Sequence, residues 1–167
     1  MTGSGLTFVP SDSIAAETAA VFAAHAERIR QLLPQVEVRH HGGSAVPGLV
    51  TSGDVDIHVR ADPQSFTAAR DALSELYEPV LLEKWDGEVA YLRARDANPP
   101  VEVVLTLTGS LDDRFHKDAW ERILADPSLV ARYNALKLDR EGGELDDYKT
   151  AKREFFWEVV RGLDDAG

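Results

Sequence analysis

The chain has 167 residues, 44% hydrophobic and 28% charged, which is the composition of an ordinary globular protein. Its formal net charge is −11, so it lacks the basic surface that neutralises phosphates in nucleic-acid-binding proteins, and a polynucleotide partner is disfavoured. It has no cysteine, which excludes disulfides, thiolate zinc sites and a cysteine nucleophile.

We expect a cytoplasmic protein with no membrane partner. The first residues lack a basic region followed by a long apolar run, and no stretch approaches the roughly 20 apolar residues that a membrane helix needs. We also expect one domain over residues 1–167, with a sheet core over about 1–110 and helices over about 111–162.

Hydrophobic periodicity and turn residues predict the secondary structure in chain order, after a loose lead-in over residues 1–10. The predicted elements are a helix over 14–33, strands over 36–40 and 54–60, a helix over 63–76, a hairpin of strands over 79–85 and 88–95 turning at Asp86-Gly87, a strand over 101–108, and helices over 112–124, 127–140 and 146–161. Strands cluster early and helices late, which predicts an α+β fold with a helical cap.

A turn of small residues and a pair of aspartates lie close together in the sequence. Gly43 and Ser44 follow the first predicted strand, and Asp54 and Asp56 open the second. Glycine lets a ligand approach the backbone, whose N–H groups hold phosphate oxygens together with a serine hydroxyl. Side chains alternate along a strand, so both aspartates share one face, where two carboxylates suit Mg²⁺. The competing interpretation is ordinary turn and capping chemistry at the start of a strand.

Glu102 is the predicted third acid. It is the only charged residue within 101–107, a β-type run that we expect to form the central strand. An unpaired carboxylate there would be costly, whereas a two-metal site for phosphoryl transfer needs a further acid from elsewhere in the sheet. The alternative is a charge on an edge strand that discourages aggregation.

Four cationic side chains are candidates for phosphate contacts. Arg93 and Arg95 share one face of the second hairpin strand, and Lys137 and Lys152 each lie four residues after a tyrosine on a predicted helix. Charge-assisted hydrogen bonds from such groups would hold a triphosphate. The alternatives are an exposed hairpin face for the arginines and amphipathic packing, with stems beside aromatic rings, for the lysines.

Three histidines lie near these residues. His58 shares the face of the aspartates and would order a metal-bound water or contact phosphate; we favour the alternative that it is only a hydrogen-bonded neighbour. His40 and His41 are adjacent, so on a strand they point to opposite faces and cannot form a simple paired metal site.

These motifs resemble a known family. Gly43-Ser44, a spacer and Asp54-Val55-Asp56-Ile57 are similar to the signature of the nucleotidyltransferase superfamily, which shares the fold of DNA polymerase beta. The segment HGGSAVPGL, residues 41–49, resembles the core of the GrpB family, and Tyr133-Asn134-Ala135-Leu136-Lys137 and Tyr148-x-x-x-Lys152 resemble its C-terminal helices. The resemblance covers about residues 35 to 160.

The resemblance implies a mixed β-sheet of about five strands flanked by helices, with a C-terminal helical layer closing the cleft. It implies metal-dependent transfer of a nucleotidyl group from a nucleoside triphosphate to a small-molecule or protein acceptor, with Mg²⁺ or Mn²⁺ as cofactor. Asp54, Asp56 and Glu102 would be the metal ligands and catalytic acids, and Gly43 and Ser44 would hold the β- and γ-phosphates.

The chain departs from the family pattern at three places. Many members of the family retain only the second acid of the pair, whereas this chain has both Asp54 and Asp56. Ala45 stands where a threonine is usual, which removes one hydroxyl, and Val101-Glu102-Val103 replaces a common Leu-His-Val. Two other functions stay open, because a fold does not fix a function. One is a non-catalytic nucleotide- or metabolite-binding module, and the other is metal-dependent hydrolysis of a phosphate ester.

Overall fold

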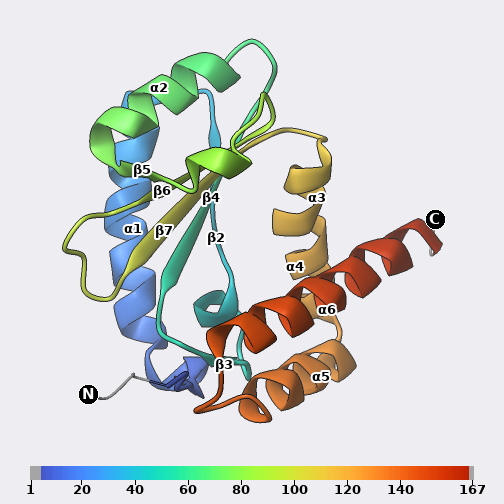
Figure 1. Cartoon of the computed structure of the whole chain (residues 1–167). Helices are drawn as coiled ribbons and strands as arrows, with labels where there is room; N and C mark the ends of the chain where they lie inside the picture. Colours follow the sequence, from blue (N-terminus) through green and yellow to red (C-terminus); the bar gives the residue numbers. More distant parts are fainter. Residues whose placement is uncertain (1–4, 166–167) are drawn as a thin grey trace.

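A mixed sheet of five strands forms the centre of the molecule (Figure 1), described for residues 5–165 by a computed structural model. The strand order is β2-β4-β7-β6-β5, with β4 parallel to β7 and the other neighbours antiparallel. The sheet confirms the predicted fold class and the central position of β7. The strands are β2 (Glu37–His41), β4 (Val55–Ala61), β5 (Glu78–Val80), β6 (Val89–Arg93) and β7 (Val101–Leu107).

Two helices, α1 (Ala15–Leu32) and α2 (Phe66–Leu76), cover one face of the sheet (Figure 1). Alternate residues of β4 and β7 point into the apolar core under these helices, while the residues between them point to the opposite face. The apolar positions therefore decide which way the polar ones face. The core residues on the two strands are Val55, Ile57, Val59 and Ala61 of β4, and Val101, Val103 and Leu105 of β7.

Four helices form the C-terminal layer: α3 (Leu111–His116), α4 (Asp118–Ala125), α5 (Pro127–Leu138) and α6 (Leu145–Asp165). They build a second apolar core, which includes Ile123, Tyr133 and Phe156. Val46 and Leu49, from the segment after β2, are buried in this core, so the turn after β2 is fastened to the helical layer. Within residues 5–165, no helix has both the length and the apolar character needed to cross a bilayer.

A second, two-stranded sheet pairs β1 (Val9–Pro10) with β3 (Val50–Thr51) in antiparallel fashion. Ser11 reinforces the pairing, because its backbone N–H donates to Leu49 O at 2.8 Å and its Oγ donates to Val46 O at 2.7 Å. The prediction of a loose lead-in is therefore wrong for residues 9 and 10, which form a strand. Their partner strand is distant in the sequence, so no local pattern indicated the pairing. Residues 1–4 lie outside the described part of the chain.

The predicted hairpin and one predicted helix differ in detail from the structure. β5 ends at Val80 and β6 begins at Val89, so the connection is a loop that includes a 3₁₀ turn over Leu82–Lys84 and not a two-residue turn at Asp86-Gly87. Trp85 Nε1 donates to Val80 O at 2.9 Å and folds this loop back on itself. The helix expected over 112–124 is broken at Lys117 into α3 and α4.

The start of α2 also lies later than predicted. Asp62 Oδ1 accepts hydrogen bonds from the backbone N–H of Ser65 at 2.9 Å and from its hydroxyl at 2.6 Å. This Asx-type turn holds residues 62–65, so the helix begins at Phe66 and not at 63.

Candidate active site

A row of charged and polar residues crosses four strands of the sheet on the face that meets the C-terminal helices. His41 of β2 pairs with Asp56 of β4, Asp56 pairs with Glu102 of β7, and Glu102 pairs with Arg93 of β6. Asp54 lies just before β4, two residues from Asp56. The register thus brings together acids that are separated by nearly fifty residues of sequence, as the two-residue period predicted for one face.

The three acids of this row share an environment that penalises negative charge. Burial raises the pKa of Asp56 to about 7, an effect strengthened by the nearby charges of Asp54 and Glu102 and opposed by Lys152. Burial also raises the pKa values of Asp54 and Glu102 above their ordinary ranges. Carboxylates gathered in this way are stabilised by a cation, and perturbed acids of this kind cluster at functional sites.

The donor chemistry of Asp54 and Asp56 fits Mg²⁺ or Mn²⁺. Within residues 5–165, no three acidic or histidine side chains converge closely enough to enclose a metal ion by themselves. Mg²⁺ does not need such a cage, because it is usually held by one or two carboxylates and completes its shell with water and substrate phosphates. Asp56 of β4 and Asp54, two residues before it, supply these two carboxylates, and Glu102 on the neighbouring strand supplies a third.

The glycine turn after β2 lies directly against Asp56. Gly42 has φ +81°, and a Cβ at this position would overlap Oδ2 of Asp56, so only glycine fits. Gly43 and Ser44 follow in a 3₁₀ turn (Gly43–Ala45) and are both buried. The Ser44 hydroxyl lies 3.1 Å from Nε2 of His40, so the backbone is the part of this turn that remains for a ligand.

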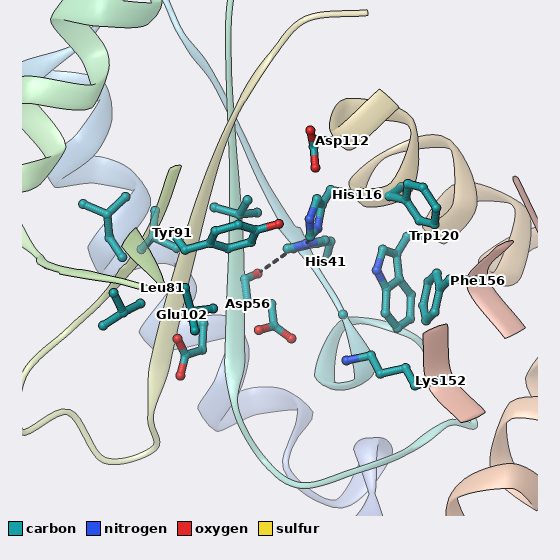
Figure 2. Close-up of a pocket in the computed structure, with 16 residues that line it drawn as sticks. His41, Asp56, Leu81, Tyr91, Glu102, Asp112, His116, Trp120, Lys152 and Phe156 are labelled. Atoms are coloured by element: carbon teal, nitrogen blue, oxygen red, sulfur yellow. Dashed lines mark hydrogen bonds between the residues drawn. The ribbon is translucent and has the colours of Figure 1, made fainter. Parts of the chain in front are cut away.

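A cavity of about 340 Å³ lies between this face of the sheet and helices α3, α4 and α6. Figure 2 shows Asp56, Glu102 and Lys152 at one end of it, and Asp112, His116 and Trp120 toward the other. The cavity therefore joins an acidic end to an aromatic end. Its remaining lining residues include His41, Gly42, Val80, Leu81, Tyr91, Phe115 and Phe156.

The two predicted arginines differ in position. Arg93 Nε donates to Glu102 Oε1 at 3.0 Å, so it lies beside the acids even though its side chain is half exposed. Arg95 lies farther along, where its Nε is 3.2 Å from Glu78 Oε2 and its side chain is 74% exposed. Arg93 is thus the arginine that the structure brings to the candidate site.

The two predicted lysines also differ. Lys152 is exposed on α6, lines the cavity and faces the carboxylates (Figure 2). Lys137 is buried beneath the glycine turn, where its Nζ donates to Val50 O at 2.7 Å and lies 4.4 Å from the centre of the Tyr133 ring. Burial lowers the pKa of Lys137 to about 7, and Lys152 adds to this effect.

A hydrogen-bonded relay fixes the proton positions of two histidines. His41 Nδ1 lies 3.2 Å from the backbone oxygen of Asp56, and a carbonyl oxygen only accepts, so Nδ1 carries the proton. Burial lowers the pKa of His41 well below its ordinary value, so its Nε2 is an unprotonated acceptor at neutral pH. His116 Nδ1 lies 3.2 Å from that atom and must therefore donate to it.

His58 and His40 lie outside the cavity. His58 is fully buried, and its Nε2 lies 2.8 Å from the hydroxyl of Thr106, which itself donates to Asp113 at 2.9 Å. His58 is thus the hydrogen-bonded neighbour that we favoured. His40 stacks on Phe22 on the opposite face from His41, as the strand period predicted.

Three cavity residues carry polar groups that the sequence did not identify: Tyr91, Asp112 and His116. Each is brought to the cavity by tertiary packing of the hairpin and α3 against the sheet, and none belongs to a recognisable motif. The sequence offered one local indication: Asp112 and His116 are four residues apart, which places both on one face of a helix.

The family model for GrpB proteins matches residues 13–161, which is most of the chain. The chain belongs to the GrpB family. A UPF0157 protein of Vibrio cholerae is 25% identical over 158 residues, covering 95% of this chain and 84% of that protein.

Solved structures agree with this family and this fold. The conserved protein GrpB from Enterococcus faecalis matches with a TM-score of 0.67 and 16% identity, over 87% of this chain and 94% of that one. Cid1, a poly(U) polymerase solved with Mg and 3′-dATP bound, matches with a TM-score of 0.53 and 13% identity, over 77% of this chain and 41% of Cid1. At these identities the likeness shows a nucleotidyltransferase-like fold in this GrpB-family chain.

Proposed function

We propose that this GrpB-family protein transfers a nucleotidyl group from a nucleoside triphosphate to a small-molecule or protein acceptor, with Mg²⁺ or Mn²⁺ as cofactor. The observation that carries the proposal is the cluster of Asp54, Asp56 and Glu102, whose raised pKa values favour binding of a cation, beside a glycine turn and the exposed Lys152. The net charge of −11 argues against a polynucleotide acceptor.

Each residue has a distinct role in the proposal. Asp54 and Asp56 would hold the metal ion, and Glu102 would complete a second metal position. Backbone groups of Gly43 and Ser44 hold the β- and γ-phosphates. Bound metal would neutralise charge on the transferring phosphoryl group.

The cationic residues orient the triphosphate. Lys152, which lines the cavity, and Arg93, which is hydrogen-bonded to Glu102, bind phosphate oxygens directly. Arg95 adds charge at the rim, and Lys137 supports the glycine turn from beneath, through its bond to Val50 O.

In the chemical step, the acceptor oxygen or nitrogen forms a bond to the α-phosphorus and the bond from the α-phosphorus to the bridging oxygen of the β-phosphate breaks. Pyrophosphate leaves. Glu102 takes the proton of the acceptor, a role suited to a carboxylate whose pKa burial has raised.

Thermal unfolding with each of the four nucleoside triphosphates tests the proposal. With Mg²⁺ or Mn²⁺ we expect a triphosphate to raise the melting temperature, and chelator to abolish the rise. Asp56→Asn should lose this response and any transfer. Asp71→Asn, the same change at an exposed position of helix α2, should keep both. A variant at Asp56 that binds and transfers normally would refute the assignment.

A non-catalytic binding module on the same fold is the second candidate. It is favoured by the cavity itself, whose aromatic walls and few polar groups can hold a ligand without any reaction. Product analysis with an α-labelled triphosphate and candidate acceptors separates the possibilities. Label on the acceptor supports transfer, free labelled phosphate or nucleotide supports hydrolysis, and unchanged triphosphate that still stabilises the protein supports the module.

A further inference from the structure

The aromatic end of the cavity presents an unpaired acceptor atom. Because His116 Nδ1 donates to His41, and burial lowers the pKa of His116 to about 4, its Nε2 carries a lone pair at neutral pH. Within residues 5–165 this atom has no hydrogen-bond partner, although His116 lines the cavity. The relay from the Asp56 carbonyl therefore fixes a hydrogen-bond acceptor at this end.

Two further polar groups line the same end. Asp112 lies four residues before His116 on α3, so both side chains share one helix face. Tyr91 of β6 lies across the cavity, with its ring centre 6.3 Å from that of His116 and its hydroxyl pointing inward (Figure 2). Burial raises the pKa of Tyr91 to about 12, so this hydroxyl keeps its proton and can donate.

Aromatic walls complete this end of the cavity. Trp120 lies 6.3 Å from His41 and 5.1 Å from Phe156, ring centre to ring centre. Flat apolar walls with a few placed polar groups are typical of sites for ring-bearing ligands. A ligand anchored by its phosphates at Lys152 and the acids would carry its ring toward these walls.

We propose that this end of the cavity recognises guanine as the base of the nucleoside triphosphate, through Asp112, His116 and Tyr91. The inference rests on the proposed function. The pairing edge of guanine offers two adjacent donors, N1–H and the 2-amino group, beside the O6 acceptor. Asp112 and His116 supply two acceptors on one helix face, and the Tyr91 hydroxyl supplies a donor.

The other bases match this set less well. Adenine and cytosine place an unprotonated ring nitrogen beside their amino group, so one lone pair would face another. Uracil has one N–H between two carbonyl oxygens, which would face the Asp112 carboxylate. A polar group left unpaired in such a pocket weakens binding strongly, which gives the site its selectivity.

Titration of the intact protein with GTP, ITP, ATP, CTP and UTP in Mg²⁺ tests the inference. GTP should bind tightest, and ITP, which lacks only the 2-amino group, about tenfold more weakly. Asp112→Asn and His116→Phe should each lower GTP affinity about tenfold, and neither should lower UTP affinity by more than about twofold; Asp112→Asn can raise it, because the uracil carbonyl oxygens then no longer face a carboxylate. His25→Phe, outside the cavity on α1, should leave the order of affinities unchanged.

The outcomes separate two failures. Equal binding of all five triphosphates, or a tighter complex with ATP, CTP or UTP, overturns the guanine assignment and leaves the proposed function standing. A loss of UTP binding as large as that of GTP in both variants gives these residues a merely structural role. No Mg²⁺-dependent binding of any triphosphate overturns both proposals. The GTP to ITP ratio of the unmodified protein decides the matter even where a variant does not fold.

Discussion

Replacing Asp56 by asparagine should make the protein more stable at pH 8 while removing its response to metal. Asp56 is a carboxylate of β4 whose neighbours in the same row, Glu102 and Asp54, are also acids. Asparagine keeps the size and the hydrogen-bonding reach of the side chain but cannot ionise. The variant therefore isolates the free energy of holding a negative charge at this place.

The size of the effect follows from the pKa. The folded pKa of about 7 exceeds the ordinary value of 3.8, a difference of about 3.2 units, which corresponds to about 4 kcal/mol at most. The folded state binds this proton more tightly than the unfolded state, so this carboxyl lowers the free energy of unfolding as the pH rises from 3.8 through 7. We expect Asp56→Asn to gain about 2 to 4 kcal/mol at pH 8 and about a quarter as much at pH 4.5.

Urea unfolding at pH 4.5 and pH 8, in chelator, measures the two free energies for wild type, Asp56→Asn and the control Asp71→Asn. Adding Mg²⁺ at pH 8 should then raise the free energy of unfolding of the wild type and the control, because metal binds the folded state, and should leave Asp56→Asn unchanged. The gain at pH 8 should correspond to about 4 to 16 °C in melting temperature.

A loss of stability at pH 8 in Asp56→Asn would refute this reasoning, because it would mean that the carboxylate is favourably paired in the folded state. A gain of equal size at both pH values would also refute it, since only ionisation makes the effect depend on pH. The same gain in Asp71→Asn would point to net charge and not to the site.

Three further predictions follow from the same contacts. Gly42→Ala should cost more than about 2 kcal/mol in urea unfolding and remove the metal response, because its Cβ meets a carboxylate, whereas Gly48→Ala, with a similar φ but open space, should cost about 1 kcal/mol. Between pH 6.5 and pH 4 the His116→Phe variant should lose less stability than wild type, measured by thermal unfolding, because a buried histidine whose pKa is lowered destabilises the fold as the pH falls. Lys137→Met should cost about 1 to 3 kcal/mol by removing the side-chain donor to the partly buried carbonyl of Val50. Lys152→Met should leave stability nearly unchanged and weaken triphosphate binding in titration.

The sheet and the acids were predictable because both depend on a strict two-residue period. Val55 and Ile57 fix the inward face of β4, so Asp54 and Asp56 had to face outward together. The isolated charge at Glu102 in an apolar run marked a central strand, and the structure rules out the alternative of an edge strand.

Other parts depend on long-range packing and left no local signal. The break of the helix at Lys117 involves neither proline nor glycine, so periodicity predicted one helix through it. The loop after β5 is set by Trp85 binding back to Val80 O, a contact that outweighs the turn preference of Asp86-Gly87. The relay from His41 to His116 joins residues 75 apart in sequence, and only the packed structure could place Lys137 beneath the turn and Lys152 in the cavity.

The charged row across the sheet also has a consequence for how the strands align. Without Glu102, β7 would begin as an unbroken apolar run, Val101 to Leu105, with little to distinguish one alignment on β4 from the next. A shift of one residue would bury the Glu102 carboxylate in the core under α1 and α2, so the acid penalises every pairing that is shifted by an odd number of residues. A polar side chain at this position therefore aids correct strand pairing whether or not the site carries the proposed activity. Selection for faithful assembly can preserve the appearance of an active site after its chemistry is lost.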